Sequence, residues 1–225
     1  MLVRNWMNKP AITIDVNDFM NDAIKLLKKH NVKMLPVTEK GKLIGIITDR
    51  DIKRASASDA TSLEIHELLY LISKIKIKDI MSRNPVTVPP DYTIDETADV
   101  LLKHNISGVP VVDQYGNIVG VITKNDLFRI IISLTGAQRR GIQFGMEVED
   151  RPGSIKEVTD IIREHGGRMA SVLTSYDMAQ KGFRRVYIRM YGIDRFKIDK
   201  LKEALKEKAV LLYMVDRREI TRETF

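Results

Sequence analysis

The chain has 225 residues, of which 44% are hydrophobic and 30% charged, with a formal net charge of +7 and no Cys. This apolar content excludes a disordered chain, and the lack of Cys excludes a disulfide framework, a thiolate metal site and a Cys nucleophile. No apolar run approaches the roughly 18 residues that a membrane-spanning helix needs, and the N-terminus lacks a signal-peptide core, so we expect a cytoplasmic protein with no membrane partner.

The basic excess has two interpretations. It could serve an anionic partner such as nucleic acid, which would make the chain a nucleic-acid-associated regulator. It could also be an ordinary solvated surface, because basic and acidic residues alternate in segments such as 200–208. We favour the second interpretation and do not expect a nucleic-acid partner. Plentiful Ile, Lys, Arg and Glu without Cys is typical of proteins from heat-loving organisms.

The sequence of residues 3–52 returns at 77–127. The offset is 74 up to Pro36, which matches Pro110, and 75 beyond a longer turn, where Gly45 matches Gly120. Polar residues recur at the same spacing as apolar ones. A repeat required only for packing would retain only its apolar pattern, so the repeat predicts two copies of one binding surface.

Each repeat predicts the element order β-α-β-β-α. Thr93 and Glu96 form a capping-box pattern at the start of the second copy's first helix, and Asn31 or Asn105 can end that helix in a left-handed conformation. The predicted strands are 11–14, 34–37 and 43–47 in the first copy and 86–88, 109–112 and 118–122 in the second, with closing helices from about Asp49 and Lys124.

The repeats define the domain boundaries. We place the first repeat at 1–54, a linker at 55–76 with a helix over 63–72, and the second repeat at 77–132. Neither repeat can easily bury its sheet face alone, so we expect the two to pack together as one module.

A different pattern follows a second linker at 133–141. Apolar residues alternate with polar ones from Ile142 to Val148, which predicts a half-buried strand. The order over 142–217 is β-α-β-β-α-β, as in ferredoxin-like folds, and 218–225 is a tail. The predicted fold class is therefore α+β/α/β, with two β-α-β-β-α repeats followed by a ferredoxin-like domain.

Two pairs of polar residues, Thr48 with Asp51 and Thr123 with Asp126, follow strands and open helices. Helix N-termini favour anions, and a carboxylate can accept two hydrogen bonds from the vicinal diol of a ribose. Each pair could instead only cap its helix. Its occurrence in both copies favours a ligand site.

The pattern Gly-h-h-Thr-x-x-Asp at 45–51 and 120–126, in which h is an apolar residue, and the Pro-Val strands at 36–37 and 110–111 resemble cystathionine-β-synthase (CBS) domains. A tandem pair resembles a Bateman module, and the resemblance covers about residues 1–132. It implies an adenosine-containing regulatory ligand (AMP, ADP, ATP, S-adenosylmethionine or NAD type) in two clefts between the repeats, with no catalytic cofactor.

The same resemblance implies roles for individual residues. Asp51 and Asp126 would bind ribose hydroxyls, Thr48 and Thr123 would support ribose or phosphate, and Arg50 would meet phosphate. The adenine would be flanked in the two sites by Leu35 and Pro36 and by Ser107, Gly108, Val109 and Pro110. Lys33-Met34 is bulkier than Ser107-Gly108, so we expect the sites to differ.

With the element order of 142–217, the loop from Asp150 to Gly153 resembles that of an ACT domain. This implies pairing of two chains as a homodimer, or amino-acid binding at the loop with Asp150 and Gly153. The Asn that many members carry near the second strand is absent from 167–171, so dimerisation is favoured. The whole arrangement resembles AcuB-type acetoin-utilisation proteins.

The sequence thus predicts a non-catalytic sensor that regulates a protein partner. No Gly-x-Ser-x-Gly, His-Glu-x-x-His or Walker motif is present, so an enzyme is not expected. His30 and His104 are interpreted as residues that favour a helix C-terminus, and no metal site is expected.

Overall fold

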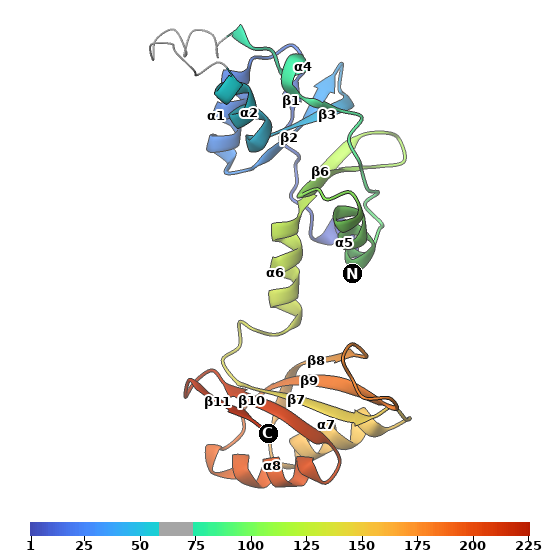
Figure 1. Cartoon of the computed structure of the whole chain (residues 1–225), viewed down its shortest axis with the longest axis vertical. Coiled ribbons are helices and arrows are strands. Elements are labelled where there is room, and N and C mark those ends of the chain that lie inside the picture. The colour runs from blue at the N-terminus through green and yellow to red at the C-terminus, as the bar shows by residue number, and fades with distance from the viewer. Residues whose placement is uncertain (59–73) are drawn as a thin grey trace. The chain divides into compact units, whose positions relative to one another are not determined.

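The computed structural model describes residues 1–58 and 74–225, in two compact units, Met1–Phe128 and Arg129–Phe225 (Figure 1). The helix predicted over 63–72 lies outside the described residues. The division between the units falls inside the last helix of the second repeat, before the predicted repeat end at 132.

The first repeat has the predicted order β-α-β-β-α. Its elements are β1 (Ile14–Asp15), α1 (Met20–His30), β2 (Met34–Glu39), β3 (Lys42–Thr48) and α2 (Asp49–Ser58), after a 3-10 helix η1 (Val3–Asn5). The second repeat begins with α4 (Ile77–Ile80) and β4 (Ser82–Arg83) and continues with α5 (Ile94–Lys103), β5 (Gly108–Val112), β6 (Ile118–Thr123) and α6 (Lys124–Leu134). An isolated parallel bridge from Val88 to Val111 stands in place of its first strand.

The helix ends form as their residues predict. The Thr93 side chain accepts a hydrogen bond from the Glu96 N–H, and the Glu96 carboxylate accepts one from the Thr93 N–H at 2.7 Å, which confirms the capping box. Asn31 and Asn105 have φ of 50° and 51°, so both adopt the left-handed conformation after their helices.

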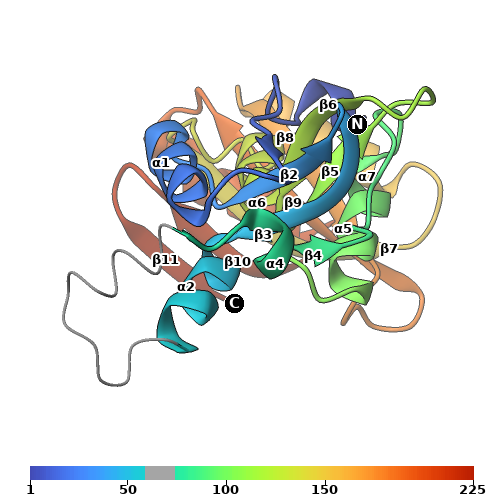
Figure 2. The same cartoon turned by 90° about the horizontal axis from the view of Figure 1, so that it is seen from above.

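The two repeats exchange their N-terminal segments. The first sheet has the order β1-β2-β3-β4, and β4, near the start of the second repeat, pairs with β3 of the first (Figure 2). Asn8, near the start of the first repeat, pairs with Val121 of β6 through backbone hydrogen bonds of 2.9 and 3.1 Å. The last strand of each repeat is therefore completed by the N-terminal segment of the other repeat.

Repeated glycines make this exchange possible. A Cβ atom on Gly45 would lie 2.8 Å from the Met81 sulfur, and one on Gly120 would lie 2.6 Å from the Met7 sulfur and 2.9 Å from the Asn8 carbonyl oxygen. Met7 and Met81 are themselves repeat equivalents. The recurring Met and Gly are thus complementary surfaces of one contact made twice.

The exchange also reaches the core of the first repeat. Ile77, from the N-terminal segment of the second repeat, is fully buried in a cluster with residues of β1, α1, β2 and β3. Among the members of this cluster are Ile14, Met20, Leu27, Leu35, Val37 and Ile47. The first repeat therefore cannot complete its core without the chain that enters the second.

The second unit is a five-stranded antiparallel sheet with helices on one face. Its elements are β7 (Ile142–Glu149), α7 (Ser154–Glu164), β8 (Arg168–Ser175), β9 (Phe183–Tyr191), η2 (Arg195–Lys197), α8 (Ile198–Lys206), β10 (Val210–Asp216) and β11 (Thr221–Thr224). The sheet order is β11-β10-β7-β9-β8. The order β-α-β-β-α-β predicted over 142–217 is present in this unit.

The prediction of a tail at 218–225 is wrong, because Thr221–Thr224 forms β11 and pairs with Tyr213–Asp216 of β10. Thr-Arg-Glu-Thr carries no apolar alternation. An edge strand of this kind is stabilised by backbone pairing and has little side-chain signal in the sequence.

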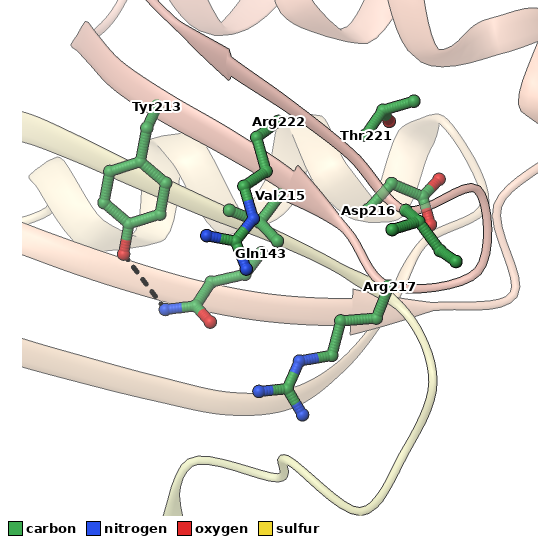
Figure 3. Close-up of a pocket in the computed structure, with 8 residues that line it drawn as sticks. Gln143, Tyr213, Val215, Asp216, Arg217, Thr221 and Arg222 are labelled. Carbon is green, nitrogen blue, oxygen red and sulfur yellow. Dashed lines mark hydrogen bonds between the residues drawn. The ribbon is translucent and has the colours of Figure 1, made fainter.

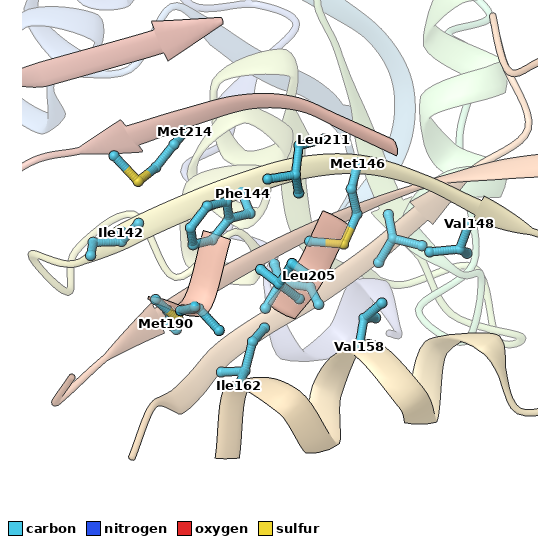
Figure 4. Packing of buried hydrophobic residues seen from close by; sticks show 13 residues of the cluster. Ile142, Phe144, Met146, Val148, Val158, Ile162, Met190, Leu205, Leu211 and Met214 are labelled. Carbon is cyan, nitrogen blue, oxygen red and sulfur yellow. The ribbon is translucent and has the colours of Figure 1, made fainter. Parts of the chain in front are cut away.

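Figure 4 shows the core between this sheet and its helices. Alternate residues of β7 enter it and meet apolar residues of both helices, as the alternation predicts: Ile142, Phe144, Met146 and Val148 with Val158, Ile162, Leu201 and Leu205. The intervening residues Gln143, Gly145 and Glu147 belong to the opposite face, away from α7 and α8.

The exchange predicts a cost for filling the space at Gly120. Gly120→Ala forces the backbone at Asn8 to move, because a carbonyl oxygen cannot rotate away as a side chain can, and we expect a loss of about 1–3 kcal/mol. The fluorescence of Trp6, the only Trp, follows unfolding of this segment in urea. Gln114→Ala, at an exposed position in the β5–β6 hairpin, is the control. Equal midpoints for the two variants would contradict the exchange.

Candidate functional site

The strand pairing brings the predicted site residues of each repeat together at one end of its hairpin. Met34 at the start of β2 lies opposite Thr48 at the end of β3, and Gly108 of β5 lies opposite Thr123 of β6. We call the first of these places the first junction and the second the second junction. Each is a strand end followed directly by a helix.

A backbone hydrogen bond closes each junction. The Asp49 N–H donates to the Lys33 carbonyl at 3.2 Å, and the Lys124 N–H donates to the Ser107 carbonyl at 2.9 Å. Residues about 16 positions apart in the sequence are therefore adjacent at corresponding places in both repeats.

The Thr and Asp residues of each junction bind one another. The Asp51 carboxylate accepts hydrogen bonds from the Thr48 N–H at 2.9 Å and hydroxyl at 2.6 Å, and the Thr48 hydroxyl accepts one from the Asp51 N–H at 3.3 Å. Asp126 and Thr123 make the same three bonds at 2.9, 2.6 and 3.4 Å. The helix-capping role is thus present in both copies.

Both carboxylates are almost completely buried, with 7% of Asp51 and 5% of Asp126 exposed. A carboxylate has about four acceptor positions, and the two bonds from Thr48 or Thr123 use about half of them. The reciprocal bonds hold each carboxylate in one orientation at a helix N-terminus, where the backbone N–H groups favour an anion or an electron-rich ligand atom.

The second junction contains a hydrogen bond from Asn8 that the sequence does not predict. The Asn8 amide donates to the Asp126 carboxylate at 2.9 Å, so the exchanged segment reaches directly into the site. The position equivalent to Asn8 in the other exchanged segment is Ser82, a shorter side chain. At the first junction, Arg54 donates to Asp51 at 2.6 Å.

The segments proposed to flank adenine match in burial but differ in side-chain size. Leu35 and Val109 are fully buried, whereas Lys33 and Ser107 are exposed. The Cε atom of Met34 lies only 3.3 Å from where a Cβ of Gly108 would be, so a side chain of the first repeat fills space beside the second.

Pro36 and Pro110 are also buried, inside the strand pairs that carry the junctions. They pair with Ile46 and Val121, two residues away along the strand from the Thr of each junction. Their role in the structure is thus within the sheet, and a ligand would meet the exposed ends at 33 and 107 first.

Basic residues differ in position between the junctions. Arg50 is exposed in the first turn of α2, and its counterpart in α6 is Asn125. The basic residue in the first turn of α6 is Lys124, whose counterpart is Asp49. Lys53 pairs with Asp49 at 3.9 Å. The first turn of each helix therefore carries its basic residue at a different position in the two junctions.

The loop after β7 holds the other two candidate residues. The Asp150 carboxylate accepts a hydrogen bond from the Tyr176 hydroxyl at 3.4 Å and pairs with Arg184 at 2.9 Å. Gly153 has φ of +90° at the N-terminus of α7 and is exposed, which suits a residue without a Cβ. Arg151 pairs with Glu157, and this pairing lowers the pKa of the Glu157 carboxyl.

The predicted helix-end histidines are both exposed at the surface. His30 and His104 are exposed at the ends of α1 and α5. Among the described residues, no group of three His, Cys, Asp or Glu is placed to hold a metal ion. None of the helices in the described ranges has the length and apolar character to cross a lipid bilayer.

Sequence reasoning missed two features. One is Asn8, whose only signal is its position next to the repeated Met7. The other is a pocket of about 320 Å³ in the second unit, with Gln143, Tyr213, Arg217 and Arg222 among its lining residues (Figure 3). The wall formed by β11 could not be anticipated from a segment without apolar alternation.

The family model for the CBS domain matches residues 3–58 and 77–133. The chain belongs to the CBS-domain family. The matched ranges are the two repeats, so the repeat, the exchanged segments and the two junctions together form a CBS-domain pair.

Two relatives from Methanocaldococcus jannaschii differ in the fraction of their own length that aligns with this chain. An L-aspartate semialdehyde sulfurtransferase is 40% identical over 130 residues, which are 57% of this chain but 23% of the enzyme. The chain therefore spans less than a quarter of that enzyme's length. An uncharacterized protein is 32% identical over 155 residues, which are 59% of this chain and 92% of that protein.

Solved structures confirm the fold of the CBS-domain pair. The CBS-domain pair of protein MJ0100, in complex with 5′-methylthioadenosine and S-adenosyl-L-methionine, has a TM-score of 0.50 at 39% identity and covers 58% of this chain and 99% of its own. A proposed acetoin utilization protein (AcuB) from Vibrio cholerae has a TM-score of 0.51 at 26% identity and covers 61% and 95%.

The hydrogen bond from Asn8 to Asp126 is expected to contribute measurably to the free energy of unfolding. Asn8→Ala leaves a buried carboxylate without one donor, and hydrogen bonds to charged groups contribute about 1.5–3 kcal/mol. We expect a loss of this size in urea unfolding followed by Trp6 fluorescence. Asn5→Ala, in the same segment and exposed, is the matched control. An Asn8→Ala midpoint equal to that of the control would show that the bond does not stabilise the fold.

Proposed function

We propose that the chain is a non-catalytic regulatory protein that binds adenosine-containing ligands at its two junctions. The observation that carries the proposal is the pair of buried carboxylates, Asp51 and Asp126, held at helix N-termini in equivalent places. The complex of the MJ0100 pair with 5′-methylthioadenosine and S-adenosyl-L-methionine supports this ligand class.

The chemistry of the junction suits a nucleoside. A ribose presents two adjacent hydroxyl donors, and a fixed carboxylate can accept from both. Thr48 and Thr123 hold the carboxylates in place. The Asp side chains therefore lose little conformational entropy when a ligand binds. The buried apolar strands behind them, with Leu35 and Val109, give the base an apolar border near the backbone of 33–36 and 107–110.

The two sites are inequivalent under this proposal. Asn8 shares Asp126 with any ligand there, and Met34 borders Gly108. A phosphate of AMP, ADP, ATP or an NAD-type ligand would meet Arg50 at the first junction and Lys124 at the second. S-adenosylmethionine and 5′-methylthioadenosine lack such a phosphate, so ligand preference is expected to differ between junctions.

The second unit is proposed to be an ACT-like domain of ferredoxin-like order that pairs two chains. The observations in favour are the sheet order β10-β7-β9-β8 with both helices on one face, and an edge strand, β8, that pairs only with β9 among the described strands. Regulation of a protein partner then requires that the ligand bind one geometry of the pair better than another.

Two aspartate variants test the ligand sites. Asp126→Ala and Asp51→Ala should each weaken binding at one junction at least tenfold, about 1.4 kcal/mol, and leave the other junction intact. Calorimetry with 5′-methylthioadenosine, S-adenosylmethionine, AMP, ADP, ATP and NADH measures both affinities. Asp99→Ala, on the exposed face of α5, is the control. Unchanged affinities in both junction variants would remove the ribose role.

Truncation tests the proposed pairing of chains. A chain of residues 1–141 retains the first unit and lacks the sheet of the second, so we expect weaker self-association than for the full chain. Sedimentation velocity over a range of concentrations compares the two. Equal dissociation constants would mean that the second unit does not join the chains.

A further inference from the structure

The sheet face of the second unit that lies opposite its helices carries a pocket far along the strands from the loop with Asp150 and Gly153. Gln143, at the start of β7, lines it, whereas Asp150 follows the end of the same strand. Its volume is about 320 Å³, within the range of small-molecule sites. β11, the strand beyond the β-α-β-β-α-β order, contributes Thr221 and Arg222 to its wall.

A buried cation stands behind the pocket. Arg189 of β9 pairs across the sheet with Gln143 and is only 4% exposed. Its Nε donates to the Thr135 carbonyl at 2.7 Å, one Nη donates to the Gln143 side-chain oxygen, and the other Nη is buried without a hydrogen-bond partner. Within the described residues, no carboxylate forms an ion pair with Arg189. Burial, and then the charge of Arg217, lowers the pKa of Arg189.

This cation fixes the orientation of Gln143. A guanidinium only donates, so the amide oxygen of Gln143 must face Arg189 and its NH₂ group must face the other way. The NH₂ group donates to the Tyr213 hydroxyl oxygen at 3.0 Å (Figure 3). Tyr213 thus accepts from Gln143 and keeps its own O–H for another acceptor.

The ring of Tyr213 is held in place by its neighbours. It stacks on Tyr187, with centroids 6.4 Å apart, and passes over Gly145, where a Cβ would lie 2.3 Å from the ring. Burial raises the pKa of Tyr213, so its hydroxyl stays protonated and able to donate at neutral pH.

The charges around the pocket do not cancel. Arg217 donates to the Ala137 carbonyl at 3.0 Å, and Arg222 is exposed. In the described part of the chain, neither has a carboxylate partner. Asp216, the acidic residue of the lining, is 2% exposed and already pairs with Arg195 and accepts from the Arg218 N–H at 2.8 Å. Donors and uncompensated cations therefore dominate the wall.

We propose that this pocket binds a small oxyanion, the carboxylate or phosphate group of a metabolite, with Arg217 and Arg222 pairing with the charge and Gln143 and Tyr213 donating hydrogen bonds. Guanidinium groups match both oxyanions in a two-point geometry, and charged hydrogen bonds are the strong ones. The site is separate from the junctions of the CBS pair and does not depend on an adenosyl ligand binding there.

The test is calorimetry on the full chain with inorganic phosphate and with malonate as probes, each against sodium chloride of equal ionic strength. We expect saturable binding of at least one probe, weakened at least tenfold by Arg222→Gln and by Arg217→Gln. Arg218→Gln removes the same charge from an exposed residue of the same turn that does not line the pocket, and should leave binding unchanged. Preference between the probes identifies the oxyanion.

Three results would overturn the proposal. They are no binding of either probe beyond the chloride control, binding that persists undiminished in Arg222→Gln and Arg217→Gln, and an equal loss in Arg218→Gln, which would mean general charge screening. Arg222 is exposed, so its variant is expected to fold, and circular dichroism checks this before titration.

Discussion

The close backbone contact between the last strand of each CBS repeat and the N-terminal segment of the other repeat is the constraint on which the first unit depends. Gly120 accepts Met7 and the Asn8 carbonyl at distances that no Cβ would allow, and Gly45 accepts Met81. The same exchange places Ile77 in the core of the first repeat and the Asn8 amide on Asp126. Folding of one repeat and construction of the other's ligand site are therefore linked.

This linkage gives the proposed ligand sites their physical character. Each carboxylate is oriented by its own Thr, so the helix cap and the ligand acceptor are one group. Under the proposed function, a ribose at Asp126 would share that carboxylate with Asn8 and would thus act on the segment that completes β6. Ligand binding at Asp126 and the position of the N-terminal segment would then be energetically coupled. A regulatory module requires such a coupling.

Sequence patterns anticipated what depends on local chemistry and repetition. The capping box of Thr93, the left-handed Asn31 and Asn105 and the meeting of Thr with Asp in both copies all followed from short spacings. The exchanged pairing did not, since β4 and Asn8 make short pairings with segments far away in the sequence, and a pairing of one or two residues has no periodicity. β11 and its pocket were not predicted for a similar reason. An edge strand and Arg residues that converge only in the fold produce no periodic pattern in the sequence.

Equilibrium titration of the full chain with S-adenosylmethionine and with AMP tests the central claim most directly, because it counts sites on a folded chain. Two repeat-equivalent but unlike junctions predict up to two adenosyl ligands per chain, with distinguishable affinities and a change in Trp6 fluorescence as the second junction fills. Folded protein that binds no adenosyl ligand, or that binds with two identical affinities and no Trp6 response, would contradict the account.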